Sequence, residues 1–98
     1  MLKREDYELL FEDYPDVLTV QELRKMMGGV GESTARHLLQ TGRIEHFVIR
    51  CTYYIPKICA IDYLMSLHYR RYSKTLKHQI DTTPLKQKRA ERSKKLND

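Results

Sequence analysis

Apolar positions along the chain follow the helical period in four stretches and alternate in a fifth. Residues 3–13, 19–27, 32–41 and 57–72 place apolar side chains three and four positions apart, which predicts amphipathic helices. Residues 44–55 instead carry alternating aromatic and β-branched side chains, which predicts a β-hairpin. The helical stripes are Tyr7, Leu10 and Phe11; Val20, Leu23 and Met27; Ala35, Leu38 and Leu39; and Ile58, Ile61, Leu64, Met65 and Tyr69.

Residues with strong backbone preferences mark the ends of these elements. Thr19 and Glu22 have the spacing of a capping box, which starts the second helix. The Gly-Gly-Val-Gly sequence at 28–31 ends that helix, since glycine allows positive φ and a close approach of two helices. Gly42 follows the next helix, and Pro56 suits the first position of the last one.

Charge divides the chain more sharply than its net value of +5 suggests. Residues 1–18 carry two Lys or Arg against six Asp or Glu, residues 19–72 carry eight against four, and residues 73–98 carry eight against three. A chain of 98 residues is one domain at most, which excludes the large enzyme folds. We therefore divide it into an appended acidic helix (1–16), a central domain (17–72) and a basic tail (73–98).

The tail has few apolar side chains and cannot bury enough surface to fold alone. We expect a mobile basic arm, with a short helix from Thr83 to Lys95 as the alternative. Such an arm adds phosphate contacts, captures a protein partner or only keeps the chain soluble.

The predicted helix at 32–41 has a polar face that suits DNA. Its side chains lie at i, i+3, i+4 and i+7 and can all donate hydrogen bonds: Ser33, Arg36, His37 and Gln40. These residue types grip phosphates or read base edges, and a helix that presents them fits the major groove. A polar stripe on a short helix is also often merely solvated, and the stripe alone leaves that interpretation open.

The predicted hairpin places Arg50 at its tip. A flexible cation there, beside a helix in the major groove, is positioned for the minor groove or a backbone phosphate. A solvated turn residue is the competing interpretation.

The chain carries no combination of residues that catalysis or metal binding requires. Cys51 and Cys59 have neither zinc-ligand spacing nor the density of secreted disulfide proteins, which favours a reduced, cytoplasmic protein. The histidines at 37, 46, 68 and 78 fall on different predicted elements, without a carboxylate pair or a phosphate loop. No apolar run is long enough to cross a membrane. We expect a cytoplasmic protein without enzyme activity, cofactor, metal or membrane contact.

Several short motifs follow one another in residues 17–67. They are Leu18-Thr19-Val20-Gln21-Glu22, the Gly29-Val30 turn, Ser33-Thr34 at the start of the second helix, Leu38-Leu39 with Thr41-Gly42, Phe47 and Ile49 in the strand, and Ile55-Pro56-Lys57. In this order and spacing the segment resembles the excisionase-type DNA-binding domains of bacterial mobile elements, which are small relatives of the MerR-type winged helix-turn-helix proteins.

The resemblance implies a mainly α fold with a small β-hairpin. It would be a winged helix-turn-helix of three core helices plus wing, extended by an N-terminal helix and a basic C-terminal tail. Residues 32–41 would be the recognition helix and the hairpin the wing. The family's DNA-contact positions correspond to Ser33, Thr34, Arg36, His37 and Gln40 on the helix and to Arg50 and Thr52 on the wing.

The resemblance also implies a role for the chain. Double-stranded DNA is the expected partner, with an integrase or recombinase as a second partner and self-association of protomers on neighbouring sites. The expected role is that of an excisionase, or recombination directionality factor, whose protomers on neighbouring sites bend the DNA. A small transcriptional regulator is the alternative. A protein-interaction adaptor without DNA binding, using the acidic helix and the basic tail, is the alternative of another class.

The chain differs from the family pattern at three places. Gly28 stands where leucine is common, and Arg50-Cys51 replaces a common Gly-Arg at the wing tip. Glu32 stands where a basic or small polar residue is common. Because Glu32 would repel a phosphate at the helix start, we expect a slightly different approach to the groove.

Overall fold

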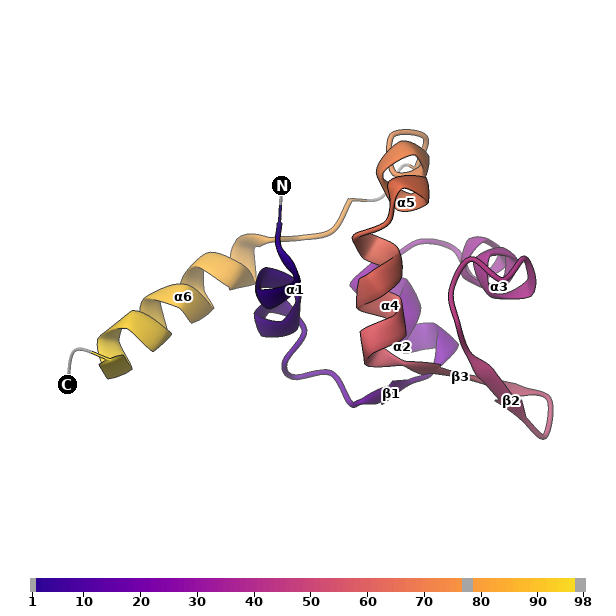
Figure 1. The fold of residues 1–98 in the computed structure, drawn as a ribbon, viewed down its shortest axis with the longest axis horizontal. Helices are drawn as coiled ribbons and strands as arrows, with labels where there is room; N and C mark the ends of the chain where they lie inside the picture. The colour runs from indigo at the N-terminus through magenta and orange to yellow at the C-terminus, as the bar shows by residue number, and fades with distance from the viewer. Residues whose placement is uncertain (1, 77–78, 97–98) are drawn as a thin grey trace.

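Six helices and a three-stranded antiparallel sheet make up the described part of the chain, residues 2–76 and 79–96 of this computed structural model (Figure 1). The predicted predominance of helix and the β-hairpin are confirmed. The elements are α1 Arg4–Leu10, β1 Val17–Leu18, α2 Val20–Met26, α3 Glu32–Gln40, β2 Phe47–Ile49, β3 Thr52–Pro56, α4 Lys57–Leu64, α5 Leu67–Tyr72 and α6 Thr83–Leu96.

The predicted capping box starts α2. The Glu22 backbone N–H donates to Thr19 Oγ1 over 3.3 Å, and the Thr19 N–H donates to Glu22 Oε1 over 3.0 Å. Val30, which is 1% exposed, fills the corner between α2 and α3. The Arg24 side chain donates to the Val30 carbonyl over 2.9 Å and so fastens this corner to α2.

The sheet contains a strand that the sequence analysis missed. β3 lies between β1 and β2, with Val17 opposite Pro56 and Leu18 opposite Ile55. Both Leu18 and Ile55 are fully buried. Two residues are too few to show an alternating pattern, so β1 is recognisable only from its pairing with β3.

The predicted single helix over residues 57–72 is wrong, because the structure breaks it at Met65 and Ser66. Ser66 adopts an extended backbone and caps α5, and its Oγ accepts from the Tyr69 N–H over 3.2 Å. The break turns Leu67 away from the core, where it is 58% exposed, and Ile58 at the start of α4 is 65% exposed. Neither residue covers the other helices as predicted.

The C-terminal segment also differs from the prediction of a mobile arm. Residues 83–96 form helix α6, and Leu85 is buried at 3% exposure within the core cluster (Figure 1). Lys88 Nζ lies 3.0 Å from Asp13 and 3.4 Å from Glu12, and Arg89 pairs with Asp6 on α1. Lys88 and Arg89 therefore bind the basic end of the chain to its acidic start. Residues 1, 77–78 and 97–98 of the predicted segments lie outside the described part.

Two lysines complete the C-terminal end of α1. Lys88 Nζ donates to the Leu9 carbonyl over 3.3 Å, and Lys57 Nζ donates to the carbonyl of the C-cap residue Phe11 over 3.4 Å. A cation at a helix C-terminus satisfies unpaired carbonyls and favours the helix dipole. Hydrogen bonds and ion pairs with Asp13 and Glu12 raise the pKa of Lys88 although its burial lowers it. The lysine is therefore charged throughout the physiological range.

Two buried tyrosines predict unfolding at alkaline pH. Burial raises the pKa of Tyr63 to about 12 and that of Tyr69 to about 12, whereas an unfolded tyrosine ionises near pH ~10. Because the folded pKa is the higher one, the stabilisation is fully present below pH ~10 and is lost as pH rises through about 12. We expect loss of helical circular dichroism in this window, together with a late rise in tyrosinate absorbance.

A variant with both Tyr63→Phe and Tyr69→Phe is the control for this titration. It should retain its helical signal to higher pH than the natural chain. Ionisation of all seven tyrosines near the ordinary value, with the helices intact, would contradict the prediction.

Candidate nucleic-acid interface

Helix α3 separates an apolar face from a polar one. Ala35, Leu38 and Leu39 are at most 1% exposed, so they fix the rotation of the helix against the core. The predicted polar stripe, Ser33, Arg36, His37 and Gln40, is exposed along its whole length. Thr34 differs from these four, because it is half-buried at the edge of the apolar face. A contact to DNA through Thr34 is therefore limited to the exposed part of its side chain.

Arg36 is the most constrained side chain of this stripe. One guanidinium nitrogen lies 3.4 Å from Glu32 Oε1 one turn earlier, and its Cζ lies 6.0 Å from the centre of the Tyr53 ring on β3. Both contacts are weak because the arginine side chain is 51% exposed. These contacts orient the guanidinium group, but they neither bury it nor neutralise its charge. The N–H donors that face solvent therefore stay free for a ligand.

The β2–β3 hairpin turns through two residues. Ile49 pairs with Thr52, and the intervening Arg50 and Cys51 have φ of 49° and 65°. Positive φ at both central positions is the turn type that matches the twist of two strands, although glycine and asparagine adopt it at lower cost. Arg50, Cys51 and Thr52 are all exposed. The predicted tip residue Arg50 thus stands at the outermost point of the hairpin.

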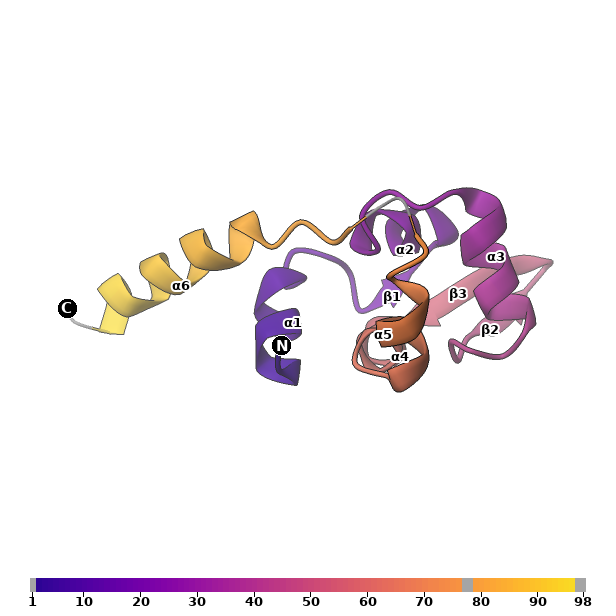
Figure 2. The same cartoon turned by 90° about the horizontal axis from the view of Figure 1, so that it is seen from above.

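Side-chain contacts tie the hairpin to the polar helix. Tyr53 lies against Arg36 of α3, and the His46 ring meets Tyr53 edge-on with a centroid distance of 5.2 Å. Two perpendicular views place α3 and the hairpin together at one end of the molecule, with α6 at the opposite end (Figures 1 and 2). The structure therefore brings the predicted helix and hairpin residues to one end and places helix α6 of the basic tail at the other.

No protein-family model, curated protein or solved structure matches this chain. What it binds is therefore inferred from its own residues and their geometry.

Sequence reasoning missed two groups of residues around this end. Phe47, Val48 and Ile49 of β2 are 42%, 54% and 52% exposed, whereas the sequence predicted only that they belong to the hairpin. Phe47 stacks on Tyr54 with ring centroids 5.6 Å apart. Arg43, which follows α3, and Arg71 of α5 line a common hollow. Only tertiary structure brings these arginines together, so no sequence motif signalled them.

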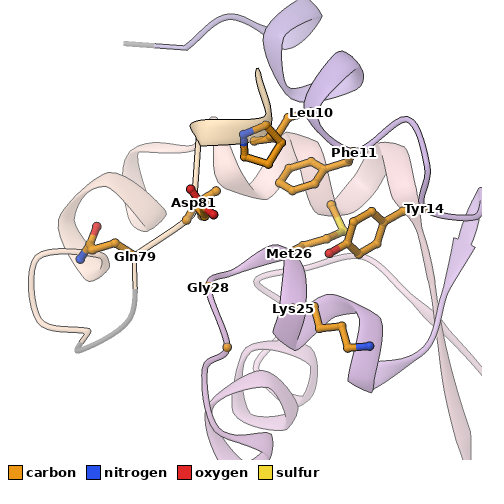
Figure 3. Close-up of a pocket in the computed structure, with 11 residues that line it drawn as sticks. Leu10, Phe11, Tyr14, Lys25, Met26, Gly28, Gln79 and Asp81 are labelled. Carbon is orange, nitrogen blue, oxygen red and sulfur yellow. The ribbon is translucent and has the colours of Figure 1, made fainter. Parts of the chain in front are cut away.

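A second hollow lies between the core and the terminal segments (Figure 3). It measures about 410 Å³, and its apolar wall comes from α1, α2 and the segment before α6, including Phe11, Tyr14 and Met26. Asp81 at its rim accepts a hydrogen bond from the Thr83 N–H over 2.9 Å and so caps α6. None of the predicted site residues lines this hollow.

No group of three or more His, Cys, Asp or Glu side chains in residues 2–76 and 79–91 is arranged to hold a metal ion. Burial and the neighbouring Glu45 raise the pKa of Cys59, so this thiol stays protonated. His78 lies outside the described residues. Within the part that the structure describes, no helix is long and apolar enough to cross a membrane.

Proposed function

We propose that the chain is a winged helix-turn-helix DNA-binding protein of a mobile element. Helix α3 would act as the recognition helix and the β2–β3 hairpin as the wing. The observation that carries this proposal is the exposed donor stripe of α3 tied through Arg36 and Tyr53 to a hairpin with Arg50 at its tip. A helix and a hairpin at one end of a small domain suit adjacent grooves of one duplex.

The surface chemistry supports duplex DNA over other anionic partners. Gln40 and Arg36 are residue types that form paired hydrogen bonds to adenine and guanine edges in the major groove. Ser33 near the α3 N-terminus would donate to phosphate, and Arg50 and Thr52 would reach the flanking backbone or minor groove. The acidic helix α1 lies away from this end, against α6 (Figure 1). Its charge therefore does not oppose DNA at the proposed interface.

The proposed biological role is that of an excisionase, or recombination directionality factor, in the cytoplasm. In this role, several protomers on neighbouring sites would bend DNA so that an integrase assembles the excision complex. The resemblance of residues 17–67 supports this part of the proposal, and a small transcriptional regulator would use the same DNA-binding surface. Footprinting over the ends of the element and over its own promoter distinguishes the two outputs.

A protein-interaction adaptor is the competing proposal, and one observation favours it. The exposed apolar strand β2 lies at an edge of the sheet, where another polypeptide can add. A salt titration with duplex DNA separates the two classes. DNA binding weakens steeply as salt rises because each phosphate contact releases condensed counterions. Absence of any duplex binding at low salt would exclude the proposed function.

Arg36→Ala is expected to relax sequence preference. If Arg36 contacts a base, the variant should lose about 1–3 kcal/mol of discrimination at one position of the site while keeping its binding to unrelated DNA. Competition binding with single-base variants of the footprinted site measures this directly. An equal loss on all sequences would instead place Arg36 on a phosphate.

Lys86→Ala is the matched control for this experiment. It removes one exposed positive charge from α6, at the end of the molecule opposite α3 (Figure 2). Affinity, preference and salt dependence should all remain unchanged. A loss as large as that of Arg36→Ala would show that the DNA surface has been placed on the wrong end of the molecule.

A further inference from the structure

The hollow lined by Arg43 and Arg71 has the composition of a phosphate-binding surface. It measures about 500 Å³ and is open on one side, and its walls are Arg43, Leu67, His68, Arg71, Tyr72 and Thr75. One guanidinium comes from the loop after α3 and the other from the last turn of α5. Guanidinium groups from two elements can hold one phosphate between them, because each offers planar paired donors.

No carboxylate of the described residues compensates the charges of Arg43 and Arg71. Arg4, Arg36, Lys57, Lys88 and Arg89 each pair with a carboxylate, whereas neither Arg43 nor Arg71 lies in an ion pair with any described residue. Glu45 and Asp62 line the adjacent hollow with Arg43, but neither approaches it to ion-pair distance. Two exposed and unpaired cations on facing elements attract an external anion.

Aromatic contacts hold the wall of this hollow in place. Tyr63 Oη lies 3.0 Å from His68 Nδ1, and the His68 ring stacks on Tyr72 with centroids 5.6 Å apart and planes inclined by 29°. Tyr63 itself is 4% exposed and belongs to the core. These contacts run from the core to the rim of the hollow and fix the face of α5 that carries Arg71. A bound ligand therefore does not have to order this face of the helix.

The hollow also lies close to the proposed recognition helix. Arg43 is three residues beyond Gln40, and its N–H donates to the Leu38 carbonyl over 2.9 Å, which fixes the backbone of the loop to the end of α3. B-DNA carries a phosphate charge for every ~1.7 Å of its axis, so backbone phosphates border any groove that α3 enters. A phosphate beyond the C-terminal end of α3 would meet Arg43 first.

We propose that Arg43 and Arg71 clamp a backbone phosphate of the DNA duplex beside the groove that α3 enters. This inference rests on the proposed function and deepens it by adding α5 to the DNA-binding surface. The clamp contributes affinity without reading sequence, because phosphates are the same at every base pair. It also assigns a role to the break between α4 and α5, which sets the direction of the helix that carries Arg71.

The test measures salt dependence in the full-length chain. A variant with both Arg43→Gln and Arg71→Gln should have a salt slope smaller by about 0.9 for each lost phosphate contact, and roughly tenfold weaker binding at moderate salt. Its preference among DNA sequences should be unchanged. The corresponding double lysine variant keeps both charges and should retain most of the slope, with a modest loss of affinity because lysine cannot bind in a paired, planar manner.

Other outcomes of the same experiment overturn the inference in different ways. If the double glutamine variant has the same salt slope of DNA binding as the natural chain, DNA does not touch these arginines, and the proposed function still stands. A loss of sequence preference with an unchanged slope would place them on bases and reject the clamp. If the natural chain itself fails to bind duplex DNA at low salt, the proposed function fails first.

Inorganic phosphate provides the final arm of the test. We expect the His68 imidazole resonance to move on addition of duplex DNA to the natural chain and not to the double glutamine variant. Movement with inorganic phosphate alone, combined with an unchanged DNA slope in the variant, would assign the hollow to a free anion and overturn the duplex assignment. Lys86→Gln, which removes one positive charge from α6, serves as the control for non-specific loss of charge and should match the natural chain in every measurement.

Discussion

Gly28→Ala is expected to destabilise the protein by about 2–4 kcal/mol, a large share of the stability of a small domain. Gly28 has a φ of 87°, and a Cβ added there would lie 2.2 Å from the backbone oxygen of Gln79. The alanine thus combines backbone strain of about 1–2 kcal/mol with a clash against backbone that has to move. Because Gln79 precedes α6, the substitution should also loosen the docking of the C-terminal segment (Figure 3).

Gly29→Ala is the matched control for this substitution. Gly29 has nearly the same φ, 89°, but a Cβ added there meets nothing within 4 Å. It should therefore cost only the backbone strain, about 1–2 kcal/mol. Urea denaturation of both variants measures the difference between them, which isolates the clash with Gln79. Equal destabilisation by the two alanines would show that the segment before α6 does not pack on the glycine corner.

Gly28 also leaves room for the C-terminal segment. A leucine at this position would occupy the space that the Gln79 backbone fills. The glycine and the C-terminal segment thus belong together, because the smaller residue makes room for the segment. The wall of the adjoining hollow joins the glycine corner, α1 and the segment before α6 (Figure 3).

Leu85→Ala is expected to have the second-largest effect, a loss of about 2–4 kcal/mol. Leu85 is 3% exposed and lies in the same buried cluster as Leu9 and Leu10 of α1. Its truncation removes apolar contacts and leaves a cavity between α6 and the rest of the fold. Thermal unfolding followed by circular dichroism should show a midpoint lower by several degrees for each kcal/mol lost.

Leu67→Ala provides the control with the same chemical change. Leu67 is 58% exposed on α5, so its truncation should change stability by no more than about 0.5 kcal/mol. If Leu85→Ala is as mild as Leu67→Ala, then α6 does not dock on α1 in solution and residues 73–98 form the mobile arm that their composition predicts.

DNA binding by the Leu85→Ala variant distinguishes the two roles considered for the tail. If α6 only stabilises the fold, the folded variant should bind DNA with the natural affinity and salt slope at a temperature well below its midpoint. A reduced slope would indicate phosphate contacts from the tail. Helix α6 lies at the end opposite α3, with Lys88 paired to Asp13 after α1 and Arg89 paired to Asp6 on α1, and this placement favours the first result (Figure 1).

Local chemistry was sufficient to predict much of the central domain. The Thr19 capping box, the glycine corner, the exposed stripe of α3 and the hairpin with Arg50 at its tip depend on residues only a few positions apart. Such features follow from backbone preferences and side-chain period, which the sequence displays directly. The break at Ser66 was local as well, and the N-cap preference of serine was the available signal for it.

Other features depend on residues that the sequence places far apart. Lys88 and Asp13 are 75 positions apart and Arg89 and Asp6 are 83 apart, so opposite charges in the two terminal segments did not by themselves identify partners. Strand β1 is too short to be recognised without β3, and no local pattern indicates that Gln79 packs on Gly28. Chain topology decides each of these contacts.

The candidate DNA-binding surface also combines features set by neighbouring residues with features set by residues far apart in the chain. The sequence by itself determined which side chains of α3 face outward and which residue stands at the hairpin tip, because the helical period and a two-residue turn place them. Only the tertiary structure decided that Tyr53 lies against Arg36, that Thr34 is half-buried, and that helix α6 lies at the opposite end. It also brought Arg43 and Arg71 into one hollow, since packing of α5 beside the loop after α3 sets that distance.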